Sequence, residues 1–482
     1  MNGGLKEWVA RGVAWSMAEK IGTALVQMGV RIVLLRLLLP EDLGAVAVLM
    51  AFSTVALVVV DSGFSQTLIR KAVPSSGDFT SVFVFNVAVS LVLYLLLTAV
   101  SPFVADYYDM PLLAQLAPVF YLLLPANALG VVQMARFARQ FRFELLSKVT
   151  FAASVASGFA AVIMALAGWG IWSIVAQQVL TLLVRAALLW WLSDWRPCAS
   201  FDGAALRRMA PYSFRLMASD LISALYNKLP QFFLGRMYAS DTLGYFDQAQ
   251  KLKDLPVTST TIAVLGVTFP ALSRIRDDRE RFAESYRQIV MVVAFVLFPV
   301  MLGMSAVAPD MFAVLLGERW MPTVPYFETI CLAGLFYPVA QVAYNVLKVQ
   351  SDGAVIVRLE AAKKVVLTAI FCVTIPRSVE AVVWGLVFFA LFEMAINFLA
   401  TIRFTSFTLL RFVRTLLPVA LVAAAMYCSV RLSVRLLPDD ALLRLVAGIA
   451  VGVASYVGLA ALFRLEAFRE TLGILRKQLL HR

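Results

Sequence analysis

The feature that most constrains this chain is a series of long, unbroken apolar runs. Leu91–Val100 and Met291–Gly303 contain no charged residue and show no alternation of polar with apolar positions. A helix needs about 20 apolar residues to cross a bilayer, whereas membrane β-strands alternate. Hydrophobic residues fill 61% of the 482 positions, charged residues only 15%, and the mean hydropathy is +0.84. A soluble domain cannot hide that much apolar surface. The sequence therefore predicts an all-α polytopic membrane protein.

The polar breaks between apolar runs predict about fourteen transmembrane helices. The expected spans are 13–38, 43–64, 82–104, 113–135, 148–168, 170–192, 212–236, 247–270, 288–315, 324–347, 361–376, 380–402, 415–437 and 443–463. The loops between them are too short for a catalytic domain, and no nucleotide-binding or nucleophile motif occurs. We therefore expect no enzyme and no catalytic residue.

Cysteine and histidine usage argues against a disulfide framework, a metal site or a cofactor. The cysteines are scattered singly, without paired spacing, at Cys198, Cys331, Cys372 and Cys428. The single histidine, His481, lies at the end of the chain. A structural zinc site or a buried histidine base is not expected from this set.

Lysine and arginine concentrate in alternate loops, which predicts the orientation of the chain. The basic loops hold, among others, Arg70, Lys71, Arg136, Arg139, Lys148, Lys348, Lys363, Lys364 and Arg403. The loops between them, such as Pro40–Leu43 and Ala105–Leu112, carry only acids. This bias predicts that both termini lie in the cytoplasm. The net charge of +12 is therefore a topology signal and not a sign of nucleic-acid binding.

One loop departs from this charge pattern. Arg431, Arg435 and Arg444 flank the loop between the last two spans, which the pattern places outside. That exception makes the thirteenth and fourteenth spans the weakest part of the predicted topology.

An internal repeat is visible at an offset of 200 residues. Residues 36–44 read RLLLPEDLG and residues 236–244 read RMYASDTLG, so an arginine, an acid, a leucine and a glycine keep their register. Each copy closes the first hairpin of a block of six spans. Six is even, so both blocks enter the membrane in the same direction, and parallel repeats of this type house their site between the halves.

This repeat predicts the order of domains along the chain. The expected parts are an interfacial segment 1–12, an N-lobe 13–193, a cytoplasmic linker 194–211, a C-lobe 212–402, a final helix pair 403–464 and a basic tail 465–482.

Matched polar stripes occur on the first span of each predicted lobe. The first stripe is Lys20, Thr23, Gln27 and Arg31, and the second, at the same positions plus 200, is Asp220, Ser223, Asn227 and Gln231. Their spacing puts each stripe on one helical face. We expect both to line a central cavity, flanked by Lys228 and Lys251. The alternative is that Lys20 snorkels to the interface and the amides hold helices together.

Two isolated acids within spans, Glu328 and Glu393, are candidates with Asp220 for binding a coupling proton or Na⁺. Helix capping or helix pairing would explain them equally well. Asp247, Lys251 and Asp254 share one face of the eighth span. They form either an ion-pair cluster at an outer mouth or an interfacial helix end.

Several segments resemble one family of membrane proteins. Residues 139–148 (RQFRFELLSK) and 168–178 (GWGIWSIVAQQ) look like the bacterial polysaccharide transporters, and residues 61–70 and 243–252 are similar to the same family. These are O-antigen and colanic-acid-type flippases of the multidrug/oligosaccharidyl-lipid/polysaccharide exporter superfamily. The resemblance covers roughly residues 10–400.

The resemblance implies two six-helix lobes plus two accessory helices in a bacterial inner membrane. It also implies a transporter that moves undecaprenyl-diphosphate-linked oligosaccharide to the outer leaflet by alternating access. Its partners would be that substrate, membrane lipids, a coupling ion and polysaccharide polymerase machinery. The family's cavity is typically cationic, whereas the candidates here mix Asp220 and Asp247 with Arg31 and Lys228.

Three alternatives stay open at this point. A cation-coupled multidrug exporter and a lipid II flippase belong to the same superfamily. A membrane polysaccharide polymerase or ligase belongs to another class, and it would need a large outer loop that this sequence lacks.

Overall fold

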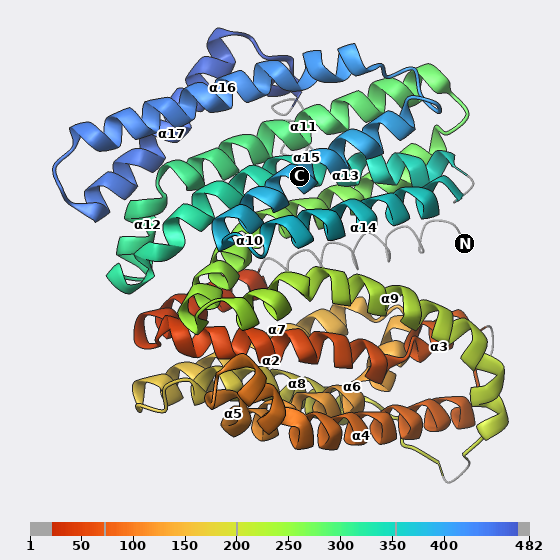
Figure 1. Cartoon of the computed structure of the whole chain (residues 1–482). Helices are drawn as coiled ribbons and strands as arrows, with labels where there is room; N and C mark the ends of the chain where they lie inside the picture. The colour runs from red at the N-terminus through yellow and green to blue at the C-terminus, as the bar shows by residue number, and fades with distance from the viewer. Residues whose placement is uncertain (1–21, 72–73, 199–200, 352–353, 471–482) are drawn as a thin grey trace. The chain divides into compact units, whose positions relative to one another are not determined.

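The computed structural model describes residues 22–71, 74–198, 201–351 and 354–470, and these residues form helices without any β-strand (Figure 1). The predicted interfacial segment 1–12, Lys20 and most of the basic tail lie outside the described residues. The chain divides into two compact units, Met1–Gly244 and Tyr245–Arg482. Each unit is described by itself.

The first unit contains a helical stretch over 22–37, followed by eight further helices. These are α2 (Pro40–Asp61), α3 (Phe64–Arg70), α4 (Ser76–Tyr108), α5 (Leu112–Phe120), α6 (Leu123–Arg139), α7 (Phe143–Leu166), α8 (Trp172–Leu192) and α9 (Gly203–Met237). The next helix, α10 (Ser240–Arg274), begins in this unit and continues into the second.

The remaining elements belong to the second unit. They are α11 (Arg279–Ala306), α12 (Ala308–Leu315), the 3₁₀ helix η1 (Glu318–Thr323), α13 (Val324–Gln350), α14 (Ala354–Thr374), α15 (Val379–Thr401), α16 (Leu409–Leu436) and α17 (Ala441–Leu462).

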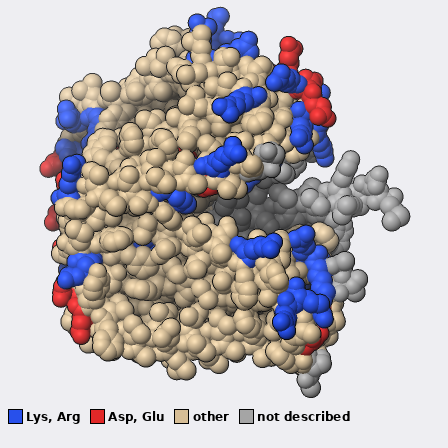
Figure 2. Space-filling view, turned by 45° about the vertical axis from the view of Figure 1, so that its right-hand side comes forward, with Lys and Arg blue, Asp and Glu red and all other residues tan. Residues whose placement is uncertain are grey.

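Every predicted span coincides with helix in this structure, in whole or in its described part. Among the described residues, ten helices are long and apolar enough to cross a membrane. The helices α9, α10 and α14 are not among these ten, and the first span is described only from residue 22. Figure 2 shows wide surfaces without charged side chains, and many of the charged ones gather along the left and right edges of the view. The protein is a multi-pass membrane protein, and the count of fourteen stays a prediction.

Local sequence signals set the ends of several helices. A capping box opens α4, in which the Asp78 amide donates to Ser75 Oγ (3.1 Å) and the Ser75 amide donates to Asp78 Oδ2 (2.7 Å). The helix α2 ends at Ser62 and Gly63, which adopt left-handed φ angles of 49° and 69°. Only glycine fits at the second position, because a Cβ there would collide with the Ser213 carbonyl oxygen.

The α3 helix that follows this turn is held by an arginine from the family-like segment 139–148. Arg139 Nη1 donates to the carbonyl oxygens of Leu68 and Ile69, at 3.2 Å each, and to that of Lys71. A cation at these carbonyls also complements the helix dipole. Arg139 therefore has a structural role at the end of α3.

In the first unit, α9 packs along α2, α3 and α4. The Phe52 and Phe232 rings meet edge to face with centroids 4.9 Å apart, and Thr67 Oγ1 lies 2.7 Å from Ser213 Oγ. The sequence predicts α9 to open a C-lobe at residue 212, yet its contacts group it with the helices that precede it. The predicted lobe boundaries stay a prediction.

The two copies of the repeated segment touch each other within the first unit. A Cβ on Gly44 would overlap the Ser240 carbonyl oxygen, and a Cβ on Gly244 would overlap the Pro40 carbonyl oxygen. Ser240 Oγ also donates to the Glu41 carbonyl oxygen at 2.6 Å. The shared glycine of the repeat is thus explained, because each copy needs a bare Cα where the start of α2 crosses the start of α10.

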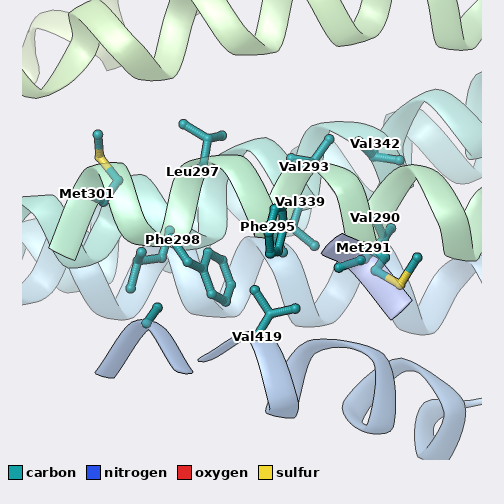
Figure 3. Close-up of a cluster of buried hydrophobic side chains, with 14 of the residues drawn as sticks. Val290, Met291, Val293, Phe295, Leu297, Phe298, Met301, Val339, Val342 and Val419 are labelled. Atoms are coloured by element: carbon teal, nitrogen blue, oxygen red, sulfur yellow. The ribbon is translucent and has the colours of Figure 1, made fainter. Parts of the chain in front are cut away.

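The core of the second unit is built around α11. Its inward residues Val290, Val293 and Met301 are at most 1% exposed and pack against α13 and α16. Figure 3 shows Phe298 of α11 pointing toward α16, where Val419 lies. Because α11 contacts both α13 and α16, it fixes the position of the α16–α17 hairpin.

Candidate substrate and ion sites in the membrane

The predicted polar stripe of the first span is described from Thr23 onward. Thr23 and Arg31 are half-buried and Gln27 is exposed. The same helix packs on α7 through other positions, since Val30 contacts Gly158. The polar face therefore lies beside the packed face, as a cavity-lining stripe requires.

The matching stripe on α9 is exposed over its first three positions. Asp220, Ser223 and Asn227 are exposed, and Lys228 beside them is half-buried. Gln231, the last position, is only 2% exposed and lies within the packed part of the unit. The assignment of both stripes to a transport cavity stays a prediction.

A membrane-embedded arginine that sequence reasoning missed lies on α8. Arg185 is half-buried, and its Nη2 donates to Asn127 Oδ1 of α6 at 3.0 Å. Its Nε is fully buried and has no hydrogen-bond partner. No ion pair involves Arg185 within the described part of the chain. A guanidinium at membrane depth with only an amide as partner is costly, which makes it a candidate binding group for an anion.

Uncharged hydroxyl groups lie one turn away from this arginine on the same helix. Thr181, four residues before Arg185, donates to Ser157 Oγ of α7 at 2.7 Å. Ser154, another turn along α7, is 4% exposed. Hydroxyl and amide groups carry no charge, so they can hydrogen-bond an anion without neutralising the cation beside them.

The sequence did carry a signal for Arg185. It stands alone near the middle of span 170–192, between Leu-Leu-Val and Ala-Ala-Leu-Leu. Because Arg185 lies within a span, it is not found when basic residues are assigned to loops.

A second embedded cation, Lys363 of α14, has carboxylate partners. It is 4% exposed, and its Nζ lies 3.1 Å from Glu393 Oε1 on α15 and also pairs with Glu360 one turn back. Glu393 is itself 8% exposed. This contact agrees with the helix pairing that was left open for Glu393, and it shows that the acid is not isolated in space. The assignment of Lys363 to a loop is wrong, because it lies within α14. The charges lie far apart in sequence, so their pairing depends on helix packing.

An aromatic ring and an amide complete this cluster from neighbouring helices. The Tyr344 ring of α13 lies 4.9 Å from Lys363 Nζ and 4.6 Å from Lys348 Nζ. Asn397 of α15 is fully buried and donates to the Ala340 carbonyl oxygen at 3.2 Å. The cluster thus joins α13, α14 and α15 through a cation, two carboxylates and a π face.

The other predicted acid is also paired. Glu328 of α13 forms a salt bridge with Arg431 of α16, and both side chains are about one third exposed, at 28% and 30%. This contact between two helices likewise agrees with helix pairing as the explanation of Glu328. The pair gives a physical reason for Arg431, one of the cations that break the charge pattern, to lie near the outer end of its predicted span.

The start of α10 carries the predicted ion pairs. Lys251 Nζ lies 2.5 Å from Asp247 Oδ2, and Lys253 Nζ lies 2.6 Å from Asp254 Oδ1. Asp247 is 3% exposed, which favours an ion-pair cluster over a simple interfacial helix end at this position.

A comparison with protein families matches residues 33–325 to a family described as polysaccharide biosynthesis protein. The match spans more than half of the chain. The protein belongs to this family, and the resemblance to bacterial polysaccharide transporters is confirmed.

Two characterised relatives align over most of the chain. Succinoglycan biosynthesis transport protein ExoT of Rhizobium meliloti (strain 1021) is 28% identical over 78% of this chain and 76% of its own length. Lipopolysaccharide biosynthesis protein WzxC of Escherichia coli (strain K12) is 24% identical over 69% of this chain and 68% of its own.

Two solved structures share the fold. The lipid II flippase MurJ in an inward closed conformation aligns with a TM-score of 0.75 at 11% identity, over 94% of this chain and 98% of that one. An inward-facing multidrug transporter of the MATE family aligns with a TM-score of 0.62 at 15% identity, over 80% and 95%. These likenesses confirm the predicted fold class.

Proposed function

We propose that this protein is a flippase that carries polyprenyl-diphosphate-linked oligosaccharide repeat units across a bacterial inner membrane. Membership of the polysaccharide biosynthesis family and relatives named for succinoglycan transport and lipopolysaccharide biosynthesis support this substrate class. The structural observation that carries the proposal is Arg185, a cation at membrane depth without a carboxylate partner in the described part of the chain.

Arg185 has the chemistry that a lipid diphosphate requires. A phosphate crossing the membrane interior loses its water, and a guanidinium replaces that water with two parallel N–H donors. In this structure Asn127 Oδ1 accepts one of these bonds, and the buried Nε has no partner. A bound phosphate would satisfy this nitrogen and neutralise the charge. The stripes of the 22–37 helix and α9 would then contact the glycan through their hydroxyl and amide groups.

We assign coupling by H⁺ or Na⁺ to the cluster of Lys363, Glu360 and Glu393. One ammonium lies between two carboxylates in a buried site, so a cation or proton that joins them would reduce the local negative charge. The positive charge of the neighbouring Lys364 also attracts the Glu393 carboxylate, so the site would hold an added cation less strongly. Asp220 on the exposed face of α9 is a second carboxylate available for an ion, whereas Glu328 is engaged by Arg431.

The basic loops support a topology with both termini in the cytoplasm. In that orientation the protein would receive its substrate from cytoplasmic glycosyl transfer and deliver it to polymerase machinery on the outer side. The protein would act as a transporter, without catalytic residues of its own.

A deletion strain tests the substrate class directly. Loss of the protein should cause lipid-linked repeat units to accumulate on the cytoplasmic side, and the wild-type gene should clear them. Arg185→Gln should fail to clear them while reaching wild-type levels in the membrane. Unchanged lipid-linked intermediates in the deletion strain would reject the proposal.

The same strain separates the alternatives. A lipid II flippase would rescue cells depleted of their own, and a multidrug exporter would raise drug tolerance without any change in surface polysaccharide. A polymerase or ligase would leave repeat units on the outer side, unpolymerised, when deleted. We expect none of these three outcomes.

A further inference from the structure

A large groove opens on the second unit between α11 and the α16–α17 hairpin. Its cavity volume is about 1020 Å³, at the upper end of the range for ligand pockets. All of its lining residues lie between Glu284 and Ala467, so the groove belongs to this unit alone. None of the stripe or cluster residues described above lines it.

The body of the groove is apolar. Met291 of α11 and Val419 and Val422 of α16 form its buried floor, at 3%, 2% and 6% exposure. Leu421 and Phe463 stand at its sides and are 60% and 65% exposed. In a membrane these surfaces accept acyl chains and not water.

One end of the groove is cationic. Arg411 and Arg414 lie three residues apart near the start of α16, and Arg464 follows the end of α17 in a left-handed conformation (φ 49°). The start of α16 and the end of α17 meet on the same side because the two helices form an antiparallel hairpin. All three arginines are exposed, and no salt bridge among the described residues engages them.

The acids of the groove are already occupied by a fourth arginine. Arg287 pairs with Glu284 at 2.6 Å and with Glu466 at 2.5 Å. The hydrogen bonds from Arg287 lower the pKa of the Glu466 carboxyl, so this acid stays ionised at neutral pH. Four arginines against two glutamates leave the lining with a net charge of +2: Arg411, Arg414 and Arg464 contribute +3, and Arg287 with its two acids contributes −1.

We propose that this groove binds an anionic glycerophospholipid as a resident lipid, with its phosphodiester headgroup on Arg411, Arg414 and Arg464. The apolar floor along α11 and α16 would hold an acyl chain. Basic pockets between membrane helices on the cytoplasmic side are suited to anionic headgroups, and the basic-loop pattern puts this end of the hairpin there. The lipid would bridge α11, α16 and α17, and would thereby stabilise the packing of the hairpin on α11 and α12.

The experiment is native mass spectrometry of the full-length, delipidated protein with phosphatidylglycerol or phosphatidylcholine. Phosphatidylglycerol should bind with one high-affinity site. The triple variant Arg411→Gln, Arg414→Gln, Arg464→Gln should weaken that site by about tenfold or more. It should also lose the rise in melting temperature that phosphatidylglycerol causes in the wild-type protein.

Two matched variants keep the test sharp. Arg274→Gln, Arg276→Gln, Arg279→Gln removes the same charge from exposed positions of the same unit outside the groove, and should change binding by less than about twofold. Ala425→Trp fills the groove without touching its charge and should also abolish the site.

Three results would overturn the proposal. They are equal binding of the two lipids, unchanged binding in the groove triple variant, and equal loss in the control triple variant. Undecaprenyl phosphate at equal concentration should leave phosphatidylglycerol in place. Displacement would be a fourth result against the proposal, because it would assign the groove to the transported lipid instead. Because none of these variants touches Arg185 or Lys363, their outcome is independent of the flippase proposal.

Discussion

Arg185 in the first unit and Lys363 in the second are both cations within apolar helices, but their surroundings differ in one respect. Lys363 has Glu393 on a neighbouring helix, Glu360 on its own and the Tyr344 ring above it. Arg185 has one amide oxygen, that of Asn127, and a buried Nε without a partner.

This difference separates two uses of a buried charge. A cation that forms ion pairs with carboxylates of neighbouring helices holds those helices together. Its charge is then largely neutralised, so it attracts an anionic ligand only weakly. A cation whose only partner is a neutral amide is not neutralised, so it can still attract an anionic ligand. The first arrangement suits a helix-linking or ion-responsive site, and the second suits a binding site for an anion.

Removal of Lys363 should have the largest effect on folding. Lys363→Met leaves Glu393 buried without its cation, and breaking a buried pair in this way costs about 3–5 kcal/mol. We expect a large drop in melting temperature and in the yield of folded protein in detergent. The double variant Lys363→Met, Glu393→Gln should recover much of the loss, because no unpaired charge remains. Equal stability of the single variant and the wild type would remove the contrast with Arg185.

Removal of Arg185 should affect transport far more than folding. Arg185→Gln deletes a charge that no carboxylate in the described residues balances and loses one hydrogen bond, so stability should change by about 1 kcal/mol or less. Clearance of lipid-linked repeat units should fall to the level of the deletion strain. A loss of folded protein as large as that of Lys363→Met would show that Arg185 is structural.

A third variant tests the same difference by giving Arg185 a carboxylate partner. Asn127→Asp places a carboxylate where the amide oxygen now lies 3.0 Å from Arg185, and so gives the first unit an ion pair like that of the second. Stability should stay within about 1 kcal/mol, because desolvation of the new carboxylate offsets the attraction. Transport should nevertheless fall, since the arginine is then neutralised. Full transport by this variant would contradict a phosphate-binding role, and Asn127→Leu is the uncharged control.

The pair between Glu328 and Arg431 should show the smallest effect. Both side chains are about one third exposed, and pairs of this kind contribute about 0–1 kcal/mol. Arg431→Gln should therefore lower the melting temperature only slightly, and high salt should reduce the difference further. A drop in melting temperature as large as that of Lys363→Met would mean that solvent exposure does not determine how much these salt bridges contribute to stability.

Hydropathy was sufficient to predict the helices. Every span expected from apolar runs coincides with helix in its described part, because in a bilayer the backbone has few alternatives to satisfying its own hydrogen bonds. The helix starts were predicted less well, because α4, α9 and α11 begin six to nine residues before the apolar runs, after the capping residues Ser75, Asp202 and Asp278.

The pairing of charges could not be predicted in the same way. Lys363 and Glu393 are 30 residues apart on different helices, and hydropathy does not say which helices are neighbours. From the sequence, Glu393 could therefore be an ion-coupling acid or a helix-pairing one, and Lys363 was counted as a loop cation. Arg185 was missed because the basic residues were sorted by loops. A rule that flags every single cation inside a span would have found it.

The crossing of Gly44 and Gly244 has a consequence for the history of the chain. Each glycine lies against the backbone of the other copy of the same nine-residue segment, at Ser240 and Pro40. In a symmetric dimer, one surface patch meets its own copy in this reciprocal way, and one substitution changes the interface twice. Here the two copies have separate codons. The other positions of the segment could therefore diverge independently, while each glycine is held in place by the backbone of the opposite copy.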